Sequence, residues 1–403
     1  MKNKMRVLLL TTKPPWPEHD GGAVASSRII AGLTFNGAEV HLLSITTPKH
    51  SGDDNLRTIK EKQLATWSEV HVDTTIRKTR LIENLLFSKI PYDLQRFYSD
   101  EVMCRIRELC KKESFDIIQC EGLVFSLYAD GIREATNARV ILRAHNLEHQ
   151  IKNMMAHREK NIFRKWYLNN LSSRIKRIES RSRIKFDAVV TISDPDAEWF
   201  NKLEGNAPVF TSPTGIETTR LRDEASALKN RVGFIGSLDW VPNIDGLVWF
   251  VKEVWPDVIN EMPDAWLHIA GRNADRKTLK KLSGRNIEFH GEVDNAMTFT
   301  RSMTVMIAPL FSGSGMRIKI IESMEAGIPV VASPTAVKGL PMEDRKEIMI
   351  ASDRNAFSKA ITELLKNDIL ANKIASNAVN RLKADFDNNK ITSGLIEFYK
   401  TMV

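Results

Sequence analysis

Residues 305–333, VMIAPLFSGSGMRIKIIESMEAGIPVVAS, combine a strand, a helix and a second strand. The apolar run at 305–310 predicts a buried strand, and the glycine-containing stretch at 312–315 leads into a helical pattern. Gly327 predicts the end of that helix, and the apolar run at 329–333 predicts the next strand. Two short apolar strands joined by a helix are typical of a parallel α/β sheet.

The rest of the chain repeats this alternation twice. In the first half we expect strands at 6–11, 39–45, 69–73, 116–120, 139–144, 188–193 and 208–212. In the second half we expect strands at 231–237, 265–271, 287–293, 305–310, 329–333 and 347–352. A polar segment without a clear period follows Pro213 and separates the halves. The sequence therefore predicts the α/β class with two Rossmann-like, doubly wound domains, at 1–215 and 216–385, and a C-terminal helix within 386–403 that could cross back to the first domain.

The composition is that of a globular protein. Its 403 residues are 42 % hydrophobic and 27 % charged, and no apolar run reaches the ~20 residues of a membrane-spanning helix. The apolar run near the start is too short for a signal peptide, so we expect a first strand there. Three cysteines, Cys104, Cys110 and Cys120, have the spacing of neither a disulfide framework nor a zinc site. We therefore expect a cytoplasmic protein.

The net charge of +8 is concentrated in residues 152–185. This segment has eleven Lys and Arg against two Glu, a local charge of +9, which leaves the rest of the chain at about −1. One interpretation is a solvated helical face whose arginines pair with acids elsewhere. Another is contact with anionic lipid headgroups or a lipid-linked acceptor, because Ile162, Phe163, Trp166 and Leu168 lie among the charges. We do not expect nucleic acid as a partner, because no stacking or recognition motif accompanies the charge.

Three loops follow predicted strands, where ligands of parallel sheets bind. Gly21 and Gly22 precede the first helix and permit a close approach of the backbone to a ligand, although an ordinary turn would use them too. His145 follows the strand at 139–144. In the loop at 312–319, the N–H groups of the helix start attract an anion, and Arg317 and Lys319 add positive charge.

Glu322 lies three residues after Lys319 and shares its helical face. A cation and a carboxylate at a helix start suit a ligand that carries both phosphates and hydroxyls. A plain surface ion pair is the alternative interpretation of this spacing.

Two short patterns imitate metal sites. Residues 145–149 match HxxEH, but that site needs both histidines on one helix, and this stretch begins at a strand end. Residues 194–196 read DxD, but they lie between a strand and a helix, where Ser193 or Asp194 is expected to cap the helix. We therefore expect no metal ligands.

Several segments together resemble glycosyltransferase family 4, whose members have the GT-B fold. The strongest similarity lies in APLFSGSGMRIKIIESMEAGIPVVAS (308–333). Other similar segments, in order, are PEHDGG (17–22), VVTISD (189–194), SPTGIE (212–217), GFIGSLDWVPNIDGL (233–247), HIAGRN (268–273) and FHGEV (289–293). The similarity extends over nearly the whole chain and is weakest at 46–115.

This resemblance implies two domains facing across a cleft, the first for the acceptor and the second for a nucleotide-sugar donor. By position, Glu322 would bind the ribose hydroxyls, Gly21 and Gly22 would approach the diphosphate and the reacting sugar, and His145 would lie near that sugar. The remaining donor-binding residues implied are Gly236, Gly271, Arg272, Val293, Gly313, Ser314, Gly315 and Met316.

The sequence departs from the family pattern at two places. The usual second glutamate, eight residues before Glu322, is Ser314, and no Arg or Lys occurs in 236–246, after the first strand of the second domain. We therefore expect Lys319, and Arg317 if it precedes the helix, to take over the neutralisation of the phosphates as catalytic residues.

The expected function is the transfer of a sugar from a nucleotide diphosphate donor with retention of configuration, in cell-surface glycan assembly. The partners would be a UDP- or GDP-sugar and a glycan, lipid-linked or small-molecule acceptor, without a cofactor or metal. The protein would act in the cytoplasm or at the inner face of the membrane. One alternative is a nucleotide-sugar epimerase, which would need further carboxylates such as Glu121 and Glu148; the other is an inactive partner subunit, which the loss at Ser314 favours.

Overall fold

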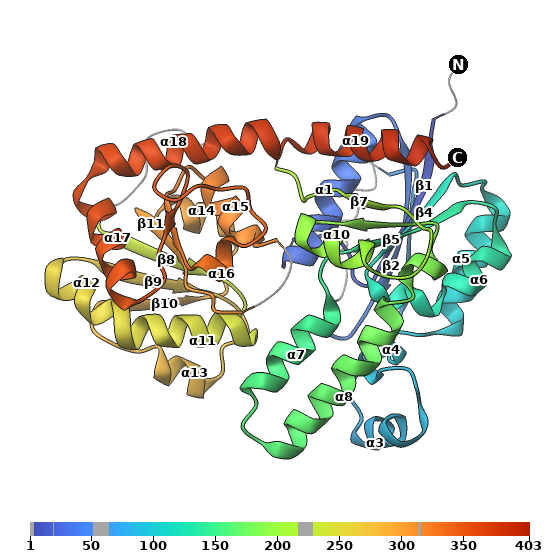
Figure 1. The fold of residues 1–403 in the computed structure, drawn as a ribbon, viewed down its shortest axis with the longest axis horizontal. Helices are drawn as coiled ribbons and strands as arrows, with labels where there is room; N and C mark the ends of the chain where they lie inside the picture. The colour runs from blue at the N-terminus through green and yellow to red at the C-terminus, as the bar shows by residue number, and fades with distance from the viewer. Residues whose placement is uncertain (1–3, 19, 51–63, 217–228, 313–315) are drawn as a thin grey trace. The chain divides into compact units, whose positions relative to one another are not determined.

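The computed structural model describes residues 4–18, 20–50, 64–216, 229–312 and 316–403. The chain divides into two compact units, Met1–Gly215 together with Asn388–Val403, and Ile216–Asp387. Each unit contains one parallel sheet with helices packed on it (Figure 1). The predicted α/β class with two doubly wound sheets is confirmed. Among the described helices, none is long and apolar enough to cross a membrane.

The described part of the first unit forms a seven-stranded parallel sheet in the order β3-β2-β1-β4-β5-β6-β7. Its strands are β1 (Arg6–Thr11), β2 (Glu39–Thr46), β3 (Thr66–His71), β4 (Ile117–Glu121), β5 (Arg139–Ala144), β6 (Ala188–Thr191) and β7 (Val209–Thr211). The chain order reverses between β1 and β4, so the loops that follow these strands diverge and leave room for a ligand at the carboxyl edge.

Helices cover both faces of this sheet. They are α1 (Gly21–Phe35), α3 (Lys78–Phe87), α4 (Tyr92–Gln95), α5 (Asp100–Lys112), α6 (Ala129–Ala135), α7 (Glu148–Arg158), α8 (Ile162–Glu179), α9 (Ser182–Lys185), α10 (Asp194–Asn201) and α19 (Asn388–Lys400). One face carries α1 and α19, which pack against each other, and the other face carries a larger apolar core with α5 and α6. Helices α7 and α8 lie side by side as a hairpin (Figure 1).

The close packing of α1 on α19 depends on a glycine. A Cβ atom at Gly32 would lie 2.4 Å from the side chain of Thr392. The side chain of Asn36 donates to Thr392 Oγ1 (2.9 Å) and to the carbonyl of Asn389 (3.0 Å). These contacts attach the C-terminal helix to the first unit.

The described part of the second unit forms a six-stranded parallel sheet in the order β10-β9-β8-β11-β12-β13. Its strands are β8 (Arg231–Ile235), β9 (Trp266–Ala270), β10 (Ile287–Gly291), β11 (Val305–Ala308), β12 (Val330–Ala332) and β13 (Met349–Ile350). Its helices are α11 (Val241–Trp249), α12 (Trp255–Glu261), α13 (Arg276–Lys281), α14 (Ala296–Arg301), α15 (Ile318–Glu325), α16 (Pro334–Val337), α17 (Arg354–Lys366) and α18 (Asp368–Asp385). The chain order reverses between β8 and β11, so their carboxyl ends mark the ligand edge of this sheet.

All of the strands expected from the sequence are present; β1 and β5 have the expected bounds, and the ends of the other strands are shifted. Strand β3 begins at Thr66 rather than 69, because it pairs with β2 from His41 onward. Helices α11 and α12 are joined by a turn of π-helix at Phe250–Val254. Pro256 has no N–H to donate within the helix, and the Trp255 N–H bonds the carbonyl of Phe250, five residues back.

Candidate functional site

A buried charge network lies at the carboxyl edge of the first sheet. The carboxylate of Glu121, which ends β4, accepts hydrogen bonds from Arg143 Nη1 (3.0 Å) and from Ser26 of α1 (3.3 Å). His145 follows β5, and its Nε2 lies 2.6 Å from the same carboxylate. Burial alone would raise the pKa of Glu121, but Arg143 and His145 outweigh burial and lower it to about 2. Glu121 therefore stays ionised and orients His145, whose Nε2–H donates to it.

The network continues to the C-terminal helix. Gln119, two positions before the end of β4 and therefore on the same face as Glu121, donates its amide N–H to Glu121. The hydroxyl of Tyr399, which is fully buried on α19, donates to the carbonyl oxygen of that amide. A continuous chain of hydrogen bonds thus links α19 to His145.

The loop after β1 contributes a second ion pair at this edge. Asp20 caps α1 by accepting the N–H groups of Gly22 and Ala23, both at 3.0 Å. Lys13 Nζ lies 2.5 Å from the carboxylate of Asp20. A Cβ at Gly22 would approach Lys13 Nζ to 3.1 Å, so the glycine leaves space for this pair. Gly21 is the exposed first residue of the helix. The sequence analysis missed Lys13 and the role of Asp20, although Asp20 belongs to the PEHDGG segment.

The HxxEH pattern forms no shared metal site. His145 precedes α7 and pairs with Glu121, whereas His149 lies within α7 and its Nδ1 pairs with the buried Glu179 (2.5 Å). Glu179 also accepts the N–H of Glu148 at 2.6 Å, which fixes the start of α7. Burial, and then the charge of Glu179, raise the pKa of Glu148 to about 7. Glu148 can therefore donate a hydrogen bond near neutral pH.

The DxD pattern is a helix start. Ser193 precedes α10, and its side chain accepts the N–H of Asp196. The predicted cap is therefore confirmed at Ser193.

A buried amine lies at the carboxyl edge of the second sheet. Lys319 Nζ donates to Asn243 Oδ1 (2.6 Å) and lies 4.6 Å from the centroid of the Phe234 ring. No carboxylate among the described residues is within ion-pair distance of this amine. Burial, and then the positive charge of Arg317, lower the pKa of Lys319 to about 7, and Glu322 opposes them. The amine therefore has one described hydrogen-bond acceptor, Asn243, which is neutral.

The other residues of the predicted loop surround this amine. Helix α15 begins at Ile318, so Arg317 is the non-helical residue before it. This position meets the condition under which Arg317 was expected to help neutralise the phosphates. Glu322 lies one turn after Lys319 and is half-buried, and Met316 is buried. Gly313, Ser314 and Gly315 lie outside the described residues.

Glycines bring the neighbouring loops against this amine and against each other. A Cβ at Gly236, which follows β8, would lie 3.1 Å from Lys319 Nζ. A Cβ at Gly271, which follows β9, would lie 2.0 Å from the carbonyl oxygen of Gly236, so only glycine fits there. The N–H of Leu238 bonds the carbonyl of Arg272 at 2.9 Å, and Val293 lies in the next loop, after β10. The loops that follow β8, β9 and β10 therefore adjoin along one edge.

The predicted site residues thus form two groups. His145, Gly21 and Gly22 belong to the first unit. The second unit contains Gly236, Gly271, Arg272, Val293, Met316, Arg317, Lys319 and Glu322. Sequence analysis missed Asn243 and Phe234, which hold the amine of Lys319. No pattern in VPNIDGL marks Asn243, because its role depends on how α11 packs beside β8.

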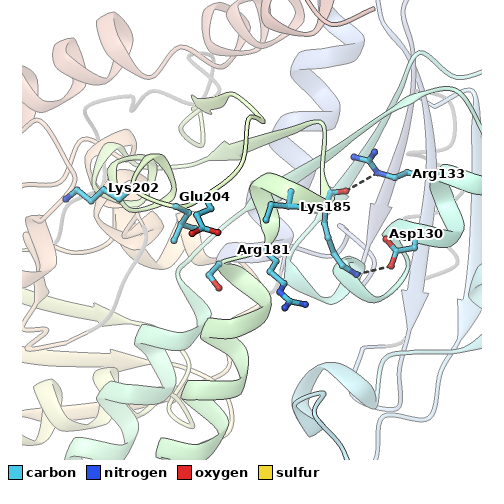
Figure 2. Close-up of a pocket in the computed structure, with 9 residues that line it drawn as sticks. Asp130, Arg133, Arg181, Lys185, Lys202 and Glu204 are labelled. Carbon is cyan, nitrogen blue, oxygen red and sulfur yellow. Dashed lines mark hydrogen bonds and ion pairs between the residues drawn. The ribbon is translucent and has the colours of Figure 1, made fainter.

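A hollow of about 820 Å³ in the first unit is lined by other residues (Figure 2). Two of its basic side chains, Lys185 and Arg133, have partners within the unit. Lys185 Nζ lies 3.0 Å from Asp130, and Arg133 donates to the Lys185 carbonyl (3.0 Å) and to Asp187 (3.1 Å). The lining segments precede β5, β6 and β7, at the amino edge of the sheet. This hollow is therefore not the ligand edge of the fold.

One group of three residues in the described part of the chain could hold a metal ion. His268 on β9 faces Glu288 and His290 on β10, with 2.9 Å between His268 Nδ1 and His290 Nε2. Glu288 is about half exposed and lies 3.2 Å from His268. The two histidines form a hydrogen bond with each other, and none of the three residues was predicted as a site residue.

Two family models match the chain. Residues 19–220 match the model described as Glycosyltransferase Family 4, and residues 229–367 match the model described as Glycosyl transferases group 1. The first match covers half of the chain, and the second falls within the second unit.

Individual relatives agree with these matches. An uncharacterised 44.6 kDa protein in the cps region of Klebsiella pneumoniae is 24% identical over 97% of this chain and 99% of that protein. The phosphatidyl-myo-inositol mannosyltransferase of Mycobacterium leprae is 29% identical over 51% of this chain and 61% of that protein. Among solved structures, Anabaena HepE in complex with UDP and glucose has a TM-score of 0.65 at 13% identity, over 98% of this chain and 100% of that chain.

Proposed function

Because the chain belongs to glycosyltransferase family 4, we propose that its second unit binds the diphosphate of a nucleotide-sugar donor and that its first unit binds the acceptor. The protein is a retaining glycosyltransferase that moves a sugar from a nucleotide donor. What remains to be assigned is which of its own residues perform each step.

The single observation that carries the assignment of the donor is the buried amine of Lys319. A buried cation without a paired carboxylate costs free energy unless it loses its proton or gains an anionic ligand. Loss of the proton is made easier here, because the pKa of Lys319 is lowered to about 7. A bound diphosphate would be the anionic ligand that keeps the amine protonated. Arg317 and the N–H groups at the start of α15 add to the attraction for an anion.

The remaining residues take roles around this phosphate site. The carboxylate of Glu322 accepts hydrogen bonds from the ribose hydroxyls. Gly236 and Gly271 allow the loops to approach the nucleotide, because side chains there would collide with backbone or with Lys319. Arg272 and Val293 lie in the loops that would line the base.

Retention follows if the acceptor attacks from the face that the phosphate leaves. The bond between the anomeric carbon and the phosphate oxygen breaks, the bond to the acceptor oxygen forms on the same face, and the acceptor proton passes to the leaving phosphate. Lys319 and Arg317 stabilise the negative charge that develops on that phosphate. His145, held by Glu121, donates to or accepts from a hydroxyl of the reacting sugar and positions it.

For the partners we propose a UDP- or GDP-sugar as donor and a lipid-linked or glycan acceptor in polysaccharide assembly. The relatives support this choice through their names, since one lies in a cps region and another is a phosphatidyl-myo-inositol mannosyltransferase. HepE was crystallised with UDP.

Calorimetric titration with UDP and with GDP tests the donor site. We expect the wild type to bind at least one of them and Lys319→Met, which preserves length without charge, to weaken that binding by about tenfold or more, as loss of a charged hydrogen bond would. Lys280→Met, an exposed lysine on α13, is the matched control and should bind as the wild type does. Equal affinity of Lys319→Met and the wild type would remove Lys319 from the phosphate site.

A further inference from the structure

The basic segment 152–185 contains cations that bond within the fold and an exposed part at the end of the α7–α8 hairpin. Toward its C-terminal end, Arg174 donates to the side chain and the carbonyl of Asn84 on α3, at 3.1 and 3.0 Å. Arg183 donates to three carbonyls, those of Asn201, Leu203 and Ala207. These cations hold the first unit together and are not available to a partner.

The exposed part is the end of the α7–α8 hairpin. Ile162 and Phe163 are 80% and 83% exposed, and Trp166, one turn further along α8, is 57% exposed. Large apolar side chains that solvent reaches to this extent are unusual when they adjoin one another on a helix face. Lys160, Arg164 and Lys165 are interspersed with them and are exposed as well.

A second patch of the same kind lies on α3, which the sequence analysis did not single out. Ile82 and Leu86 occupy one helical stripe and are 56% and 67% exposed, and Phe87 beside them is 83% exposed. Lys78, Arg80 and Lys89 flank these apolar side chains and are exposed.

Both patches belong to one rigid part of the first unit. Arg174 of α8 bonds Asn84 of α3, and both residues are buried. Figure 1 draws α3 and the loop end of the α7–α8 hairpin at the same end of this unit, away from its sheet.

Both patches carry positive charge that is unpaired within the described part of the chain. None of the six cations named above forms an ion pair with any described residue, and residues 158–165 and 77–89 contain one glutamate each and no other acidic residue.

We propose that these two patches form one docking surface for an anionic lipid bilayer. The docking surface consists of Ile82, Leu86, Phe87, Ile162, Phe163 and Trp166 with Lys78, Arg80, Lys89, Lys160, Arg164 and Lys165. Its apolar side chains enter the headgroup region and its unpaired cations contact lipid phosphates, so the protein lies on the membrane surface. This deepens the proposed function, because it brings a lipid-linked acceptor to the first unit, but membrane attachment itself does not depend on sugar transfer.

The charge pattern favours lipid over protein. A protein interface usually excludes lysine from its centre, whereas here lysines and arginines alternate with the aromatic and aliphatic side chains. An anionic bilayer accepts both kinds of side chain at once, because phosphates lie directly above hydrocarbon.

Vesicle sedimentation tests the proposal with the full chain and without nucleotide or acceptor, so its outcome is independent of catalysis. We expect the wild type to bind vesicles of phosphatidylcholine mixed with phosphatidylglycerol, to bind phosphatidylcholine alone more weakly, and to be released by salt. Phe163→Ser with Trp166→Ser should reduce binding by about tenfold or more, since burying one such ring is worth that much. Leu86→Ser with Phe87→Ser should do the same.

Matched controls separate the docking surface from general effects. Phe35→Ser removes an equally exposed ring (71%) from α1, outside the docking surface, and should leave binding unchanged. Arg164→Glu with Lys165→Glu should abolish the preference for the anionic vesicles, whereas Lys280→Glu with Lys281→Glu on α13 should keep it. Circular dichroism of each variant checks that it folds.

Three outcomes would overturn the proposal. The wild type could fail to bind the mixed vesicles, the two serine pairs could bind as the wild type does, or Phe35→Ser could lose as much as they do. If the wild type ignores vesicles but self-associates through Phe163 and Trp166, the docking surface contacts protein and the lipid assignment is wrong.

Discussion

At the scale of single residues, the proposed contact of Lys319 with the diphosphate predicts that nucleotide binding depends on pH. Its pKa is lowered from 10.5 to about 7 in the free protein, whereas a diphosphate binds the protonated amine. Above pH 7 binding must therefore take up a proton, and affinity should fall by up to about tenfold per pH unit between pH 7 and 9.

Calorimetry at several pH values, in buffers of different ionisation enthalpy, measures both the affinity and the proton uptake. Lys319→Arg is the matched control, because a guanidinium stays charged and its profile should be flat over this range. A flat profile in the wild type would contradict a phosphate contact by an amine whose pKa is near 7.

The hydrogen-bonded chain to His145 predicts an effect from a residue outside the ligand edge. Tyr399→Phe removes the hydroxyl that donates to Gln119, which in turn holds Glu121. We expect kcat to fall by up to about tenfold, which corresponds to the free energy of one neutral hydrogen bond, while nucleotide affinity is unchanged.

Tyr92→Phe is the control for Tyr399→Phe, because it also removes a buried hydroxyl of the first unit, one that accepts the N–H of Arg77. It should leave kcat at the wild-type value. A loss of nucleotide affinity in Tyr399→Phe, or an equal loss of kcat in both variants, would indicate a general structural effect.

Two kinds of candidate site residue differ in how far the sequence identifies them. Lys319 and Glu322 were predictable because helical spacing alone puts them on one face next to a glycine loop. Asn243, Glu121, Arg143 and Tyr399 depend on which distant segments meet, and Tyr399 bonds a residue 280 positions away. Such partners follow from tertiary packing, which spacing within one segment does not encode.

At the scale of elements, the strands were predictable and their surroundings were less so. Central strands are buried on both faces and therefore read as unbroken apolar runs, as at β1 and β11. The division of 152–185 into structural and exposed cations was not predictable, because it depends on α3 and on loops that pack against α8 and α9.

The packing of α19 on α1 should be sensitive to the one glycine at their contact. Gly32→Val would force side-chain atoms into Thr392, and we expect it to lower the free energy of unfolding by about 1–3 kcal/mol. Gly394→Ala on α19 is the control, because no described atom lies within 4 Å of a Cβ there, and it should be neutral or stabilising. Urea unfolding of both variants measures the difference, and equal midpoints would show that α19 does not pack closely on α1.

At the scale of the whole molecule, the proposed reaction uses both units, because Lys319 and Glu322 belong to one and His145 to the other. A transferase, an epimerase and an inactive subunit are distinguished by their products. A transferase releases the nucleotide diphosphate, an epimerase keeps it attached to an altered sugar, and an inactive subunit does neither.

The most direct test is to incubate the protein with UDP-, GDP- and dTDP-sugars and a polysaccharide-precursor acceptor, in EDTA, and to measure released nucleotide and the anomeric configuration of the product by NMR. We expect one donor to be consumed, with retained configuration, activity undiminished by EDTA, and a loss of about tenfold or more in Lys319→Met. An epimerised donor without release, an inverted product, or activity that EDTA abolishes and Mn²⁺ restores would contradict the account.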